Sequence, residues 1–341
     1  MTDPRTLHQR TCVADAHADS LMWNRDLNVA SDRGHVDFPR LREAGVKLQC
    51  FTVVTRGFPI IGGFPVFAAW HGWPRAARRT EWSRALYQIE RLERFCAESN
   101  GQVAIATSSQ ALEDNLRADR ISAVIGIEGA HALEGKVERV EELWRRGVRF
   151  MSLTHLANNE LGGSSFPLEP EKALTPLGHA VLDEMARIRM PVDVAHASRT
   201  TLAEILAHPT ARPMCSHTGV QAQGGGWRNL PDEALRKIAD RGGVVGIIFA
   251  TLYVGGKEAE DVVRHIEHAV NVMGEDAVSL GSDFDGMIPL PRGMRDVRDL
   301  HVLTAAMQRR GMPERRIEKI LGENWRRFFA ETLDGAPHPN A

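Results

Sequence analysis

The sequence predicts an α/β protein that folds as a (β/α)₈ barrel of the TIM type. Short apolar runs alternate with longer amphipathic stretches along the 341 residues, as in repeated strand–helix units. There are eight such runs, and a helical pattern follows nearly every one, as a closed eight-stranded barrel requires. Six of the eight runs are followed by an ionisable residue suited to metal binding or acid–base chemistry. Because the C-terminal strand ends of a parallel barrel lie on one face, we expect these residues to converge around one axis.

The predicted strands are short, apolar and rich in β-branched residues, as strands buried on both faces of a parallel sheet are. In chain order they cover residues 12–16, 46–54, 123–127, 148–153, 191–195, 212–216, 244–249 and 277–281. A further apolar run at 102–108 falls between the second and third of these. We interpret it as a short extra strand within a long connection.

The predicted helices show the 3.6-residue period of amphipathic helices. The stretch 81–99 places Leu86, Ile89, Leu92 and Phe95 on one face. The same pattern recurs at 108–118, 136–147, 175–189, 198–208, 231–242, 258–274 and 300–311. Several of these stretches end at glycine or begin at serine or threonine, which are common helix boundaries.

We expect one domain that spans residues 1–341, with no linker or internal repeat. The segment at about 56–82 is rich in glycine, proline and aromatic residues, and we interpret it as an elaborated loop that serves as a lid or a subunit contact. The tail at 334–341 is expected to be frayed.

Composition excludes several classes of function. The formal net charge is −2, so we expect no partnership with nucleic acid or with an anionic membrane. None of the four cysteines forms a CxxC pair, which argues against a cysteine-bound structural zinc. No apolar run is long enough to cross a membrane, and the first residues lack the apolar stretch of a secretory signal. The expected location is the cytoplasm.

The ionisable residues that follow the strands define the candidate site. They are His17 and Asp19, Glu128, His155, His196, His217, Asp283 and Asp285. Residues i and i+2 of a strand point to the same side, so His17 and Asp19 are placed to chelate one ion. Imidazole and carboxylate suit Zn²⁺ and neighbouring divalent metals, and a third ligand from another strand would leave a coordination position for water.

Any one of these residues alone is more often an ordinary polar residue or a helix cap. The joint placement of six strand ends favours a metal or acid–base site instead. His131, three residues after Glu128, stays open between a structural role and a role near the site. The remaining histidines are expected to be structural or solvated: His8, His35, His71, His179, His208, His265, His268 and His301.

Eight segments of the chain together resemble the renal (membrane) dipeptidase family, peptidase family M19, within the amidohydrolase superfamily of (β/α)₈ barrels. They are "DAHADSL", "IGIEGAHAL", "SLTHLANN", "VDVAHAS", "CSHTG", "WRNLPDEAL", "GSDFDG" and "LGENWRRFF". They appear in the expected order over roughly residues 11–330. The set as a whole is specific, although no single segment is.

The resemblance implies a binuclear zinc centre. His17 and Asp19 match the ligands of the first metal, Glu128 matches the carboxylate that bridges both, and His196 and His217 match the ligands of the second. Asp283 matches the catalytic residue that handles the proton. His155 matches the residue that contacts the substrate carbonyl, and Arg228 matches the arginine that binds the C-terminal carboxylate.

The implied enzyme is a zinc-dependent dipeptidase that takes two Zn²⁺ per chain and tolerates or prefers a D-residue at the C-terminal position. The family also suggests a homodimer. Ala250 stands where some relatives carry a bulky polar residue, so the side-chain preference stays open. Alternatives within the superfamily are an N-acyl-D-amino-acid deacylase, a lactonase or a deaminase. A deaminase site usually has two histidines in the first strand, where this chain has His17 and Asp19. A non-enzymatic scaffold would be expected to have lost ligands.

Overall fold

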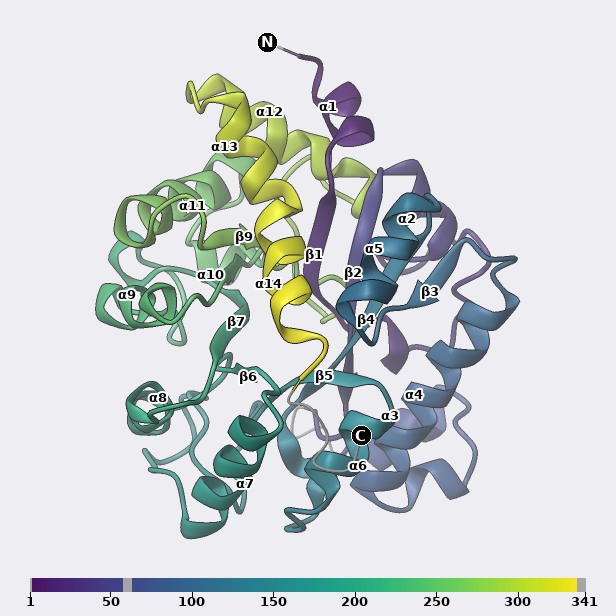
Figure 1. Cartoon of the computed structure of the whole chain (residues 1–341), viewed down its shortest axis with the longest axis vertical. Coiled ribbons are helices and arrows are strands. Elements are labelled where there is room, and N and C mark those ends of the chain that lie inside the picture. Colours follow the sequence, from purple (N-terminus) through teal and green to yellow (C-terminus); the bar gives the residue numbers. More distant parts are fainter. Residues whose placement is uncertain (1, 58–62, 336–341) are drawn as a thin grey trace.

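A computed structural model describes residues 2–57 and 63–335 of the chain. Nine strands of the described residues form one parallel sheet, and eight of them curve into a nearly closed barrel in the order β1-β2-β4-β5-β6-β7-β8-β9 (Figure 1). The strands are β1 Val13–Ala18, β2 Val46–Val54, β3 Val103–Ile105, β4 Ile121–Glu128, β5 Val148–Ser152, β6 Val192–Asp193, β7 Pro213–Thr218, β8 Val245–Ile247 and β9 Val278–Leu280. The predicted fold class is confirmed.

The extra strand is also present. β3 lies off the path of the barrel and pairs in parallel with the first residues of β4, from Val103 opposite Ile121 to Ile105 opposite Ala123. The apolar run at 102–108 therefore extends the sheet outward and does not form a ninth strand of the barrel.

Polar contacts bring the first and last strands together. The carboxylate of Asp15 on β1 accepts hydrogen bonds from the backbone N–H and the hydroxyl of Ser282, each at 2.7 Å. Asp19 N–H donates to the carbonyl of Phe284 at 2.8 Å. Gln49 on β2 also donates to the Asp15 carboxylate, at 2.7 Å. A buried carboxylate needs such partners, and here they come from β2 and from the segment that follows β9.

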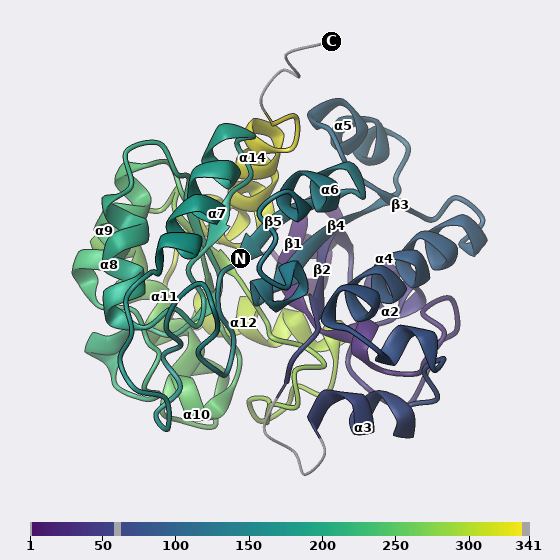
Figure 2. The same cartoon turned by 90° about the horizontal axis from the view of Figure 1, so that it is seen from below.

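Helices surround the strands, as Figures 1 and 2 show. The α-helices are α1 Pro4–Arg10, α2 Phe38–Glu43, α3 Gly63–Trp70, α4 Glu81–Glu98, α5 Ser109–Arg117, α6 Arg139–Arg145, α7 Pro176–Arg187, α8 Arg199–Ala207, α9 Asp232–Asp240, α10 Thr251–Val254, α11 Ala259–Met273, α12 His301–Arg309, α13 Glu314–Glu318 and α14 Asn324–Thr332. Short 3₁₀ or π turns are η1 Ser20–Met22, η2 Ala76–Arg78, η3 Ala130–Leu133, η4 Gln221–Gln223, η5 Val297–Leu300 and η6 Lys319–Glu323.

Helix α14 packs against β1 and β9 (Figure 1). Trp325 Nε1 donates to the Leu280 carbonyl at 2.8 Å, and Asn324 Nδ2 donates to the Val278 carbonyl at 2.8 Å. Just before the helix, Gly322 approaches β1 so closely that a Cβ there would lie 2.1 Å from the Cys12 carbonyl oxygen. The helix therefore covers the place where the barrel closes.

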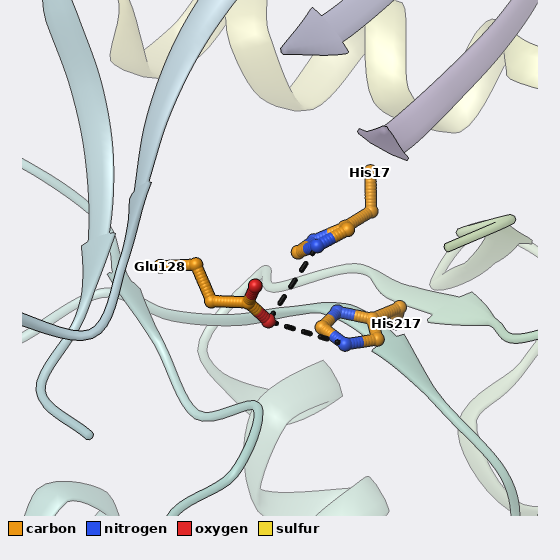
Figure 3. Close-up of side chains that lie close together, drawn as sticks. All are labelled: His17, Glu128 and His217. Atoms are coloured by element: carbon orange, nitrogen blue, oxygen red, sulfur yellow. Dashed lines mark ion pairs between the residues drawn. The ribbon is translucent and has the colours of Figure 1, made fainter. Parts of the chain in front are cut away.

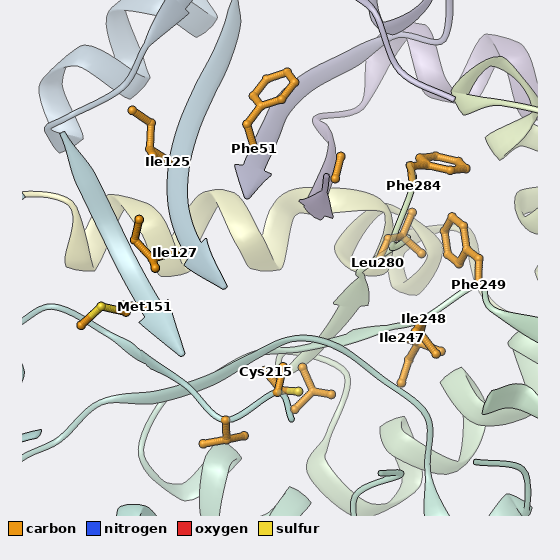
Figure 4. Close-up of a cluster of buried hydrophobic side chains, with 14 of the residues drawn as sticks. Phe51, Ile125, Ile127, Met151, Cys215, Ile247, Ile248, Phe249, Leu280 and Phe284 are labelled. Carbon is orange, nitrogen blue, oxygen red and sulfur yellow. The ribbon is translucent and has the colours of Figure 1, made fainter. Parts of the chain in front are cut away.

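The core lies between the strands and their helices. Figure 4 shows part of it, with side chains contributed by most of the strands. Phe51, Ile125, Ile127, Ile247 and Leu280 are among its fully buried members. This packing holds the strand ends, and hence the site, in fixed positions.

The segment at about 56–82 contains α3 and η2, with the exposed Trp70 at the end of α3. Residues 58–62 of this predicted loop and 336–341 of the predicted frayed tail lie outside the described residues. Within the described ranges, no helix has the length and apolar character needed to cross a membrane.

Candidate metal centre

The candidate residues lie at the C-terminal ends of strands from around the barrel. His17, Glu128 and His217 are within the last residues of β1, β4 and β7. The others follow strands directly: Asp19 after β1, His155 after β5, His196 after β6 and Asp283 after β9. Because all these strands are parallel, their C-terminal ends open onto one face.

Glu128 lies at the centre of the histidines. Its Oε1 is 3.5 Å from His17 Nε2, 3.0 Å from His196 Nε2 and 3.5 Å from His217 Nε2. Its Oε2 is 3.5 Å from His155 Nε2. Figure 3 shows the carboxylate directed at both His17 and His217. One carboxylate is therefore shared by four imidazoles that come from four different strands.

Two aspartates complete the cluster on the His17 side. Asp19 Oδ1 is 3.6 Å from His17 Nε2 and accepts a hydrogen bond of 2.6 Å from the Thr52 hydroxyl. His17, Asp19 and Asp283 each offer a ligand atom, and these atoms lie within 4.8 Å of one another. Asp19 no longer has extended backbone, since β1 ends at Ala18, so a turn and not simple strand alternation brings it beside His17.

The donor set fits divalent metal ions. Three overlapping groups have ligand atoms within 4.8 Å: His17, Glu128 and His217; Glu128, His155 and His196; and His17, Asp19 and Asp283. His17 Nε2 is buried and has no hydrogen-bond partner among the described residues. Nε2 atoms of His196 and His217 approach to 3.2 Å. Imidazole nitrogens and carboxylate oxygens gathered in this way suit zinc and its neighbours.

The electrostatics of the cluster favour an ionised Glu128 and neutral imidazoles at His196 and His217. Burial alone would raise the pKa of Glu128, but the imidazoles of His155 and His17 hold it well below its ordinary value. Burial lowers the pKa of His196 and of His217 well below the usual range. An ionised carboxylate and neutral imidazoles are the protonation states in which these groups bind metal.

The pKa values of His17 and Asp283, by contrast, are raised. Burial would lower the pKa of His17, but the carboxylates of Glu128 and Asp19 raise it well above its ordinary value. Burial, together with the negative charges of Asp19 and Glu128, raises the pKa of Asp283 well above the usual range. The carboxylates of Asp19, Glu128 and Asp283 therefore repel one another, and a bound cation would reduce this repulsion.

Ser216, the residue before His217, orients two of the rings. Its hydroxyl lies 2.9 Å from His17 Nδ1 and 2.9 Å from His217 Nδ1. A hydroxyl oxygen can accept two hydrogen bonds, so both rings can donate from Nδ1 and leave the Nε2 lone pairs free toward Glu128. Such outer partners fix the tautomer of metal-binding histidines.

His155 is oriented through its other nitrogen. Its Nδ1 lies 3.0 Å from the carbonyl oxygen of Arg56. A carbonyl only accepts, so Nδ1 carries a proton, and Nε2 can donate a hydrogen bond only when the ring is doubly protonated. The geometry of His155 allows two roles: donor to a substrate oxygen as an imidazolium, or ligand as a neutral ring.

A cavity of about 150 Å³ opens beside the cluster. Its lining includes Glu128, His217, Asp283 and Arg228. Arg228 is 6% exposed and donates from Nη1 to the His217 carbonyl at 2.9 Å, while its Nε and Nη2 have no partner among the described residues. Its guanidinium carbon lies 4.9 Å from the ring centre of Tyr253. Two guanidinium donors are thus held, unpaired, next to the candidate metal ligands.

His131 is buried beside the cluster without joining it. Both its ring nitrogens lack a partner among the described residues, and burial lowers its pKa to about 3. Other histidines expected to be structural have ordinary partners, such as His8 with Thr304 and His265 with the backbone of Val220. None of these eight belongs to a candidate metal group in the described part of the chain.

Sequence reasoning missed several residues that shape the site. Ser216 and Thr52 orient His17, His217 and Asp19, and Tyr253 lies against Arg228. The available signal for Ser216 and Thr52 was a polar residue near the end of an otherwise apolar strand. That signal gives no partner, because the partner depends on which strands become neighbours.

The chain is similar to known proteins over nearly its whole length. The model of a family described as "Membrane dipeptidase (Peptidase family M19)" matches residues 1–337. A Klebsiella pneumoniae protein described as "Uncharacterized protein in pqqA 5'region" is 33% identical over 256 residues, which cover 71% of this chain and 93% of that protein.

Two solved structures share the fold. A metallo peptidase from Rhodobacter sphaeroides, liganded with a phosphinate mimic of the dipeptide L-Ala-D-Ala, has a TM-score of 0.82 and 25% identity and covers 95% of this chain and 99% of its own. A probable dipeptidase from Pseudomonas aeruginosa has a TM-score of 0.83 and 19% identity, with 97% of each chain covered.

Proposed function

The chain belongs to the membrane dipeptidase family, peptidase family M19, and is a metallo-dipeptidase; from this premise we propose its metal, its residue roles and its substrate. His17 and Asp19 would hold one zinc ion and His196 and His217 a second, with Glu128 as the ligand shared by the two, so that the chain would take two zinc ions. The substrate is a dipeptide with a free C-terminal carboxylate and, preferably, a D-residue at its C-terminal position.

Arg228 is the observation that carries the proposal about substrate. Its Nε and Nη2 are buried and unpaired among the described residues, beside a cavity that also reaches Glu128 and Asp283. A buried guanidinium with two free donors forms a planar, two-bonded pair with a carboxylate. If that carboxylate lies one residue beyond the scissile bond, peptides extended at the C-terminus are excluded, and only a single C-terminal residue can be released, as from a dipeptide.

The proposed hydrolysis uses the other cavity residues for proton transfer and polarisation. Divalent metals bound here would supply an activated water at neutral pH and would polarise the peptide carbonyl. Asp283 takes a proton from the attacking water as the new C–O bond forms, and it gives that proton to the leaving nitrogen as the C–N bond breaks. His155, doubly protonated, donates from Nε2 to the carbonyl oxygen as negative charge develops there.

The preference for a D-residue rests on the Rhodobacter sphaeroides structure, which is 25% identical to this chain and was solved with a mimic of L-Ala-D-Ala. The test is a kinetic panel of matched dipeptides. We expect L-Ala-D-Ala and related L-Xaa-D-Xaa peptides to have the highest kcat/KM, L-Xaa-L-Xaa peptides to be slower, and C-terminal amides to be poor substrates. Faster turnover of N-acyl-D-amino acids or of lactones would instead assign a deacylase or a lactonase.

Replacement of Arg228 tests the carboxylate contact directly. We expect Arg228→Ala to lower kcat/KM for L-Ala-D-Ala by about 100-fold or more, mainly through KM, because truncating one partner of a buried charge pair costs about 2–5 kcal/mol. The metal content should equal that of the wild type. The variant should also lose the preference for the free acid over the C-terminal amide, measured with both substrates.

Arg199→Ala is the matched control, since Arg199 lies near Arg228 in a neighbouring cavity but does not line the cavity of the metal cluster. It should retain wild-type kinetics. An Arg228→Ala enzyme that loses metal, or that still discriminates acid from amide, would contradict the assignment.

A further inference from the structure

Asp285, the second aspartate of the segment "SDFDG", has no part in the proposed chemistry. Its carboxylate is nevertheless buried, and both of its oxygens accept hydrogen bonds. It is 3% exposed. Its Oδ2 accepts from the Ser20 hydroxyl at 2.5 Å and from Arg25 Nη2 at 2.6 Å, and its Oδ1 accepts from the backbone N–H of His35 at 2.7 Å. A buried carboxylate with three donors is held firmly in one orientation.

The backbone of Asp285 is tied to the same region. Its N–H donates to His35 Nδ1 at 2.9 Å, and its carbonyl accepts from Trp23 Nε1 at 2.8 Å. All of these partners belong to the segment 20–35, which follows β1. Asp285 therefore fastens the loop after β9 to the loop after β1, the strand that carries His17.

Asp283 depends on this loop for its position. Its side chain makes no hydrogen bond to any residue in the described part of the chain, so no direct contact of that kind holds its carboxylate. Its Oδ1 lies over Gly286, where a Cβ would come within 2.0 Å of that oxygen. The position of the Asp283 carboxylate therefore follows from the conformation of its own backbone.

That backbone is strained. Asp283, Asp285 and Met287 have φ angles of 63°, 66° and 60°, in the left-handed region that non-glycine residues rarely adopt. Such conformations persist only where surrounding contacts enforce them. Within this loop, Asp285 has the contacts that can do so.

We propose that Asp285 is a positioning residue for catalysis. By binding Ser20, Arg25 and His35, it enforces the left-handed loop that holds the Asp283 carboxylate beside His17 and Asp19. The inference rests on the proposed role of Asp283 in proton transfer, and it adds a second aspartate that acts only through the first.

The test compares Asp285→Asn, Asp283→Asn and the double variant, all metal-loaded, with L-Ala-D-Ala as substrate. We expect Asp285→Asn to lower kcat by about 100-fold, as a displacement of about 1 Å can. KM should change by less than about threefold, and metal content should match the wild type. In the Asp283→Asn background, adding Asp285→Asn should lower kcat by less than about threefold, because residues that act as a unit are non-additive.

Asp296→Asn is the control for loss of a buried, arginine-bound aspartate that makes no hydrogen bond to Asp285 or to its partners Ser20, Arg25 and His35. Asp296 is 5% exposed and accepts from Arg40 and Arg298 at 3.2 and 2.8 Å. It should lose stability and keep kcat within about twofold of the wild type. If Asp285→Asn does not fold, Trp23→Phe removes the hydrogen bond to the Asp285 carbonyl and keeps an aromatic ring at that position. It should lower kcat by about fivefold, and this loss too should vanish in the Asp283→Asn background.

A wild-type kcat in both Asp285→Asn and Trp23→Phe would overturn the proposal, as would losses that add in full to that of Asp283→Asn or that follow loss of metal. Failure of the proposed function is distinguishable, because Asp283→Asn alone would then remain active or the wild type would not hydrolyse dipeptides.

Discussion

At the scale of single residues, the site depends on the lack of a side chain at Gly129. Gly129 follows Glu128 with a φ of 79°, and a Cβ there would lie 2.6 Å from His131 Nδ1 and 2.9 Å from His155 Cβ. Glycine alone avoids both the strain and the overlap. Gly129 therefore lets Glu128, His131 and His155 pack around one short stretch of backbone.

Gly129→Ala is expected to reduce activity strongly. The alanine would pay about 1–2 kcal/mol for its left-handed backbone and would also displace His155 or His131. We expect kcat/KM for L-Ala-D-Ala to fall by more than about tenfold, measured on metal-loaded enzyme, together with a lower Tm.

Gly274→Ala is the control that introduces backbone strain without displacing a neighbouring side chain. Gly274 has a φ of 84° after α11, and a Cβ there would meet no atom within 4 Å. It should lower Tm to a similar extent and leave kcat/KM unchanged. Equal activities of the two variants would show that the space beside His155 has no functional importance.

The sequence predicted which residues form the candidate site better than it predicted the residues that orient them. The residues placed at strand ends, from His17 to Asp283, lie together because parallel strands of a barrel fix that outcome. Their roles stay predictions. The partners that orient them, such as Ser216 for His17 and Arg25 for Asp285, could not be predicted. A hydrogen bond between residues about 200 positions apart depends on strand neighbours and on register, which residue types do not encode.

At the scale of elements, prediction succeeded where periodicity and burial agree. Strand β2 has the predicted bounds, 46–54, because most of its residues are apolar and all but Lys47 are buried. Strand β6 has only two residues, Val192–Asp193, where 191–195 was predicted, because the backbone turns soon afterwards and the Ala197 N–H donates to the Val194 carbonyl. Helix α14 was not predicted, although Trp325, Phe328 and Phe329 have helical spacing. The fact that α14 covers the junction of β1 and β9 depends on closure of the barrel, which local patterns do not show.

Helix α2 and η5 are joined through Asp296, and this link should depend on pH. Burial alone would raise the pKa of Asp296, but hydrogen bonds from Arg298 and Arg40 lower it to about 2. A depressed carboxylate pKa contributes stability above the unfolded value of about 3.9, and the contribution disappears as pH falls toward 2. We expect Asp296→Asn to lower the free energy of unfolding by about 1–2 kcal/mol at pH 7, allowing for solvent screening.

The measurement is urea unfolding of both proteins between pH 3 and pH 7, and the difference between them should shrink steadily below about pH 4. Asp119→Asn is the control, because Asp119 pairs with Lys47 and Arg42 at the surface, where its side chain is 63% exposed. It should change stability much less at every pH. A difference for Asp296→Asn that is constant with pH would show that its effect comes from packing.

At the scale of the whole molecule, the metal cluster joins distant parts of the chain. His17 and Asp283, near opposite ends of the sequence, belong to one candidate group, and the barrel closes between the strands that carry them. Bound cations would therefore connect β1, β4, β7 and the loop after β9 at a single place. Stability of the barrel and occupancy of the site should then be linked.

Removal of metal should destabilise the protein as well as inactivate it. Without a cation, Asp19, Glu128 and Asp283 lie close together in a buried space, where burial and the negative charges of Asp19 and Glu128 raise the pKa of Asp283. A ligand that binds only the folded state stabilises it by about 2.7 kcal/mol at 100 times its Kd. We expect chelator-treated protein to lose activity and several degrees of Tm, and zinc to restore both at about two ions per chain.

His17→Ala and His301→Ala distinguish this linkage from a general effect of zinc. His17 belongs to two candidate groups, whereas His301 belongs to none among the described residues. The His301→Ala protein should regain Tm on addition of zinc as the wild type does, and His17→Ala should regain little. A wild-type Tm that does not respond to chelator, or a zinc-dependent rise of equal size in both variants, would mean that the cluster does not connect the strands through a bound ion. Because the carboxylates repel one another only when no cation lies between them, the rise in Tm measures occupancy of this cluster independently of catalysis.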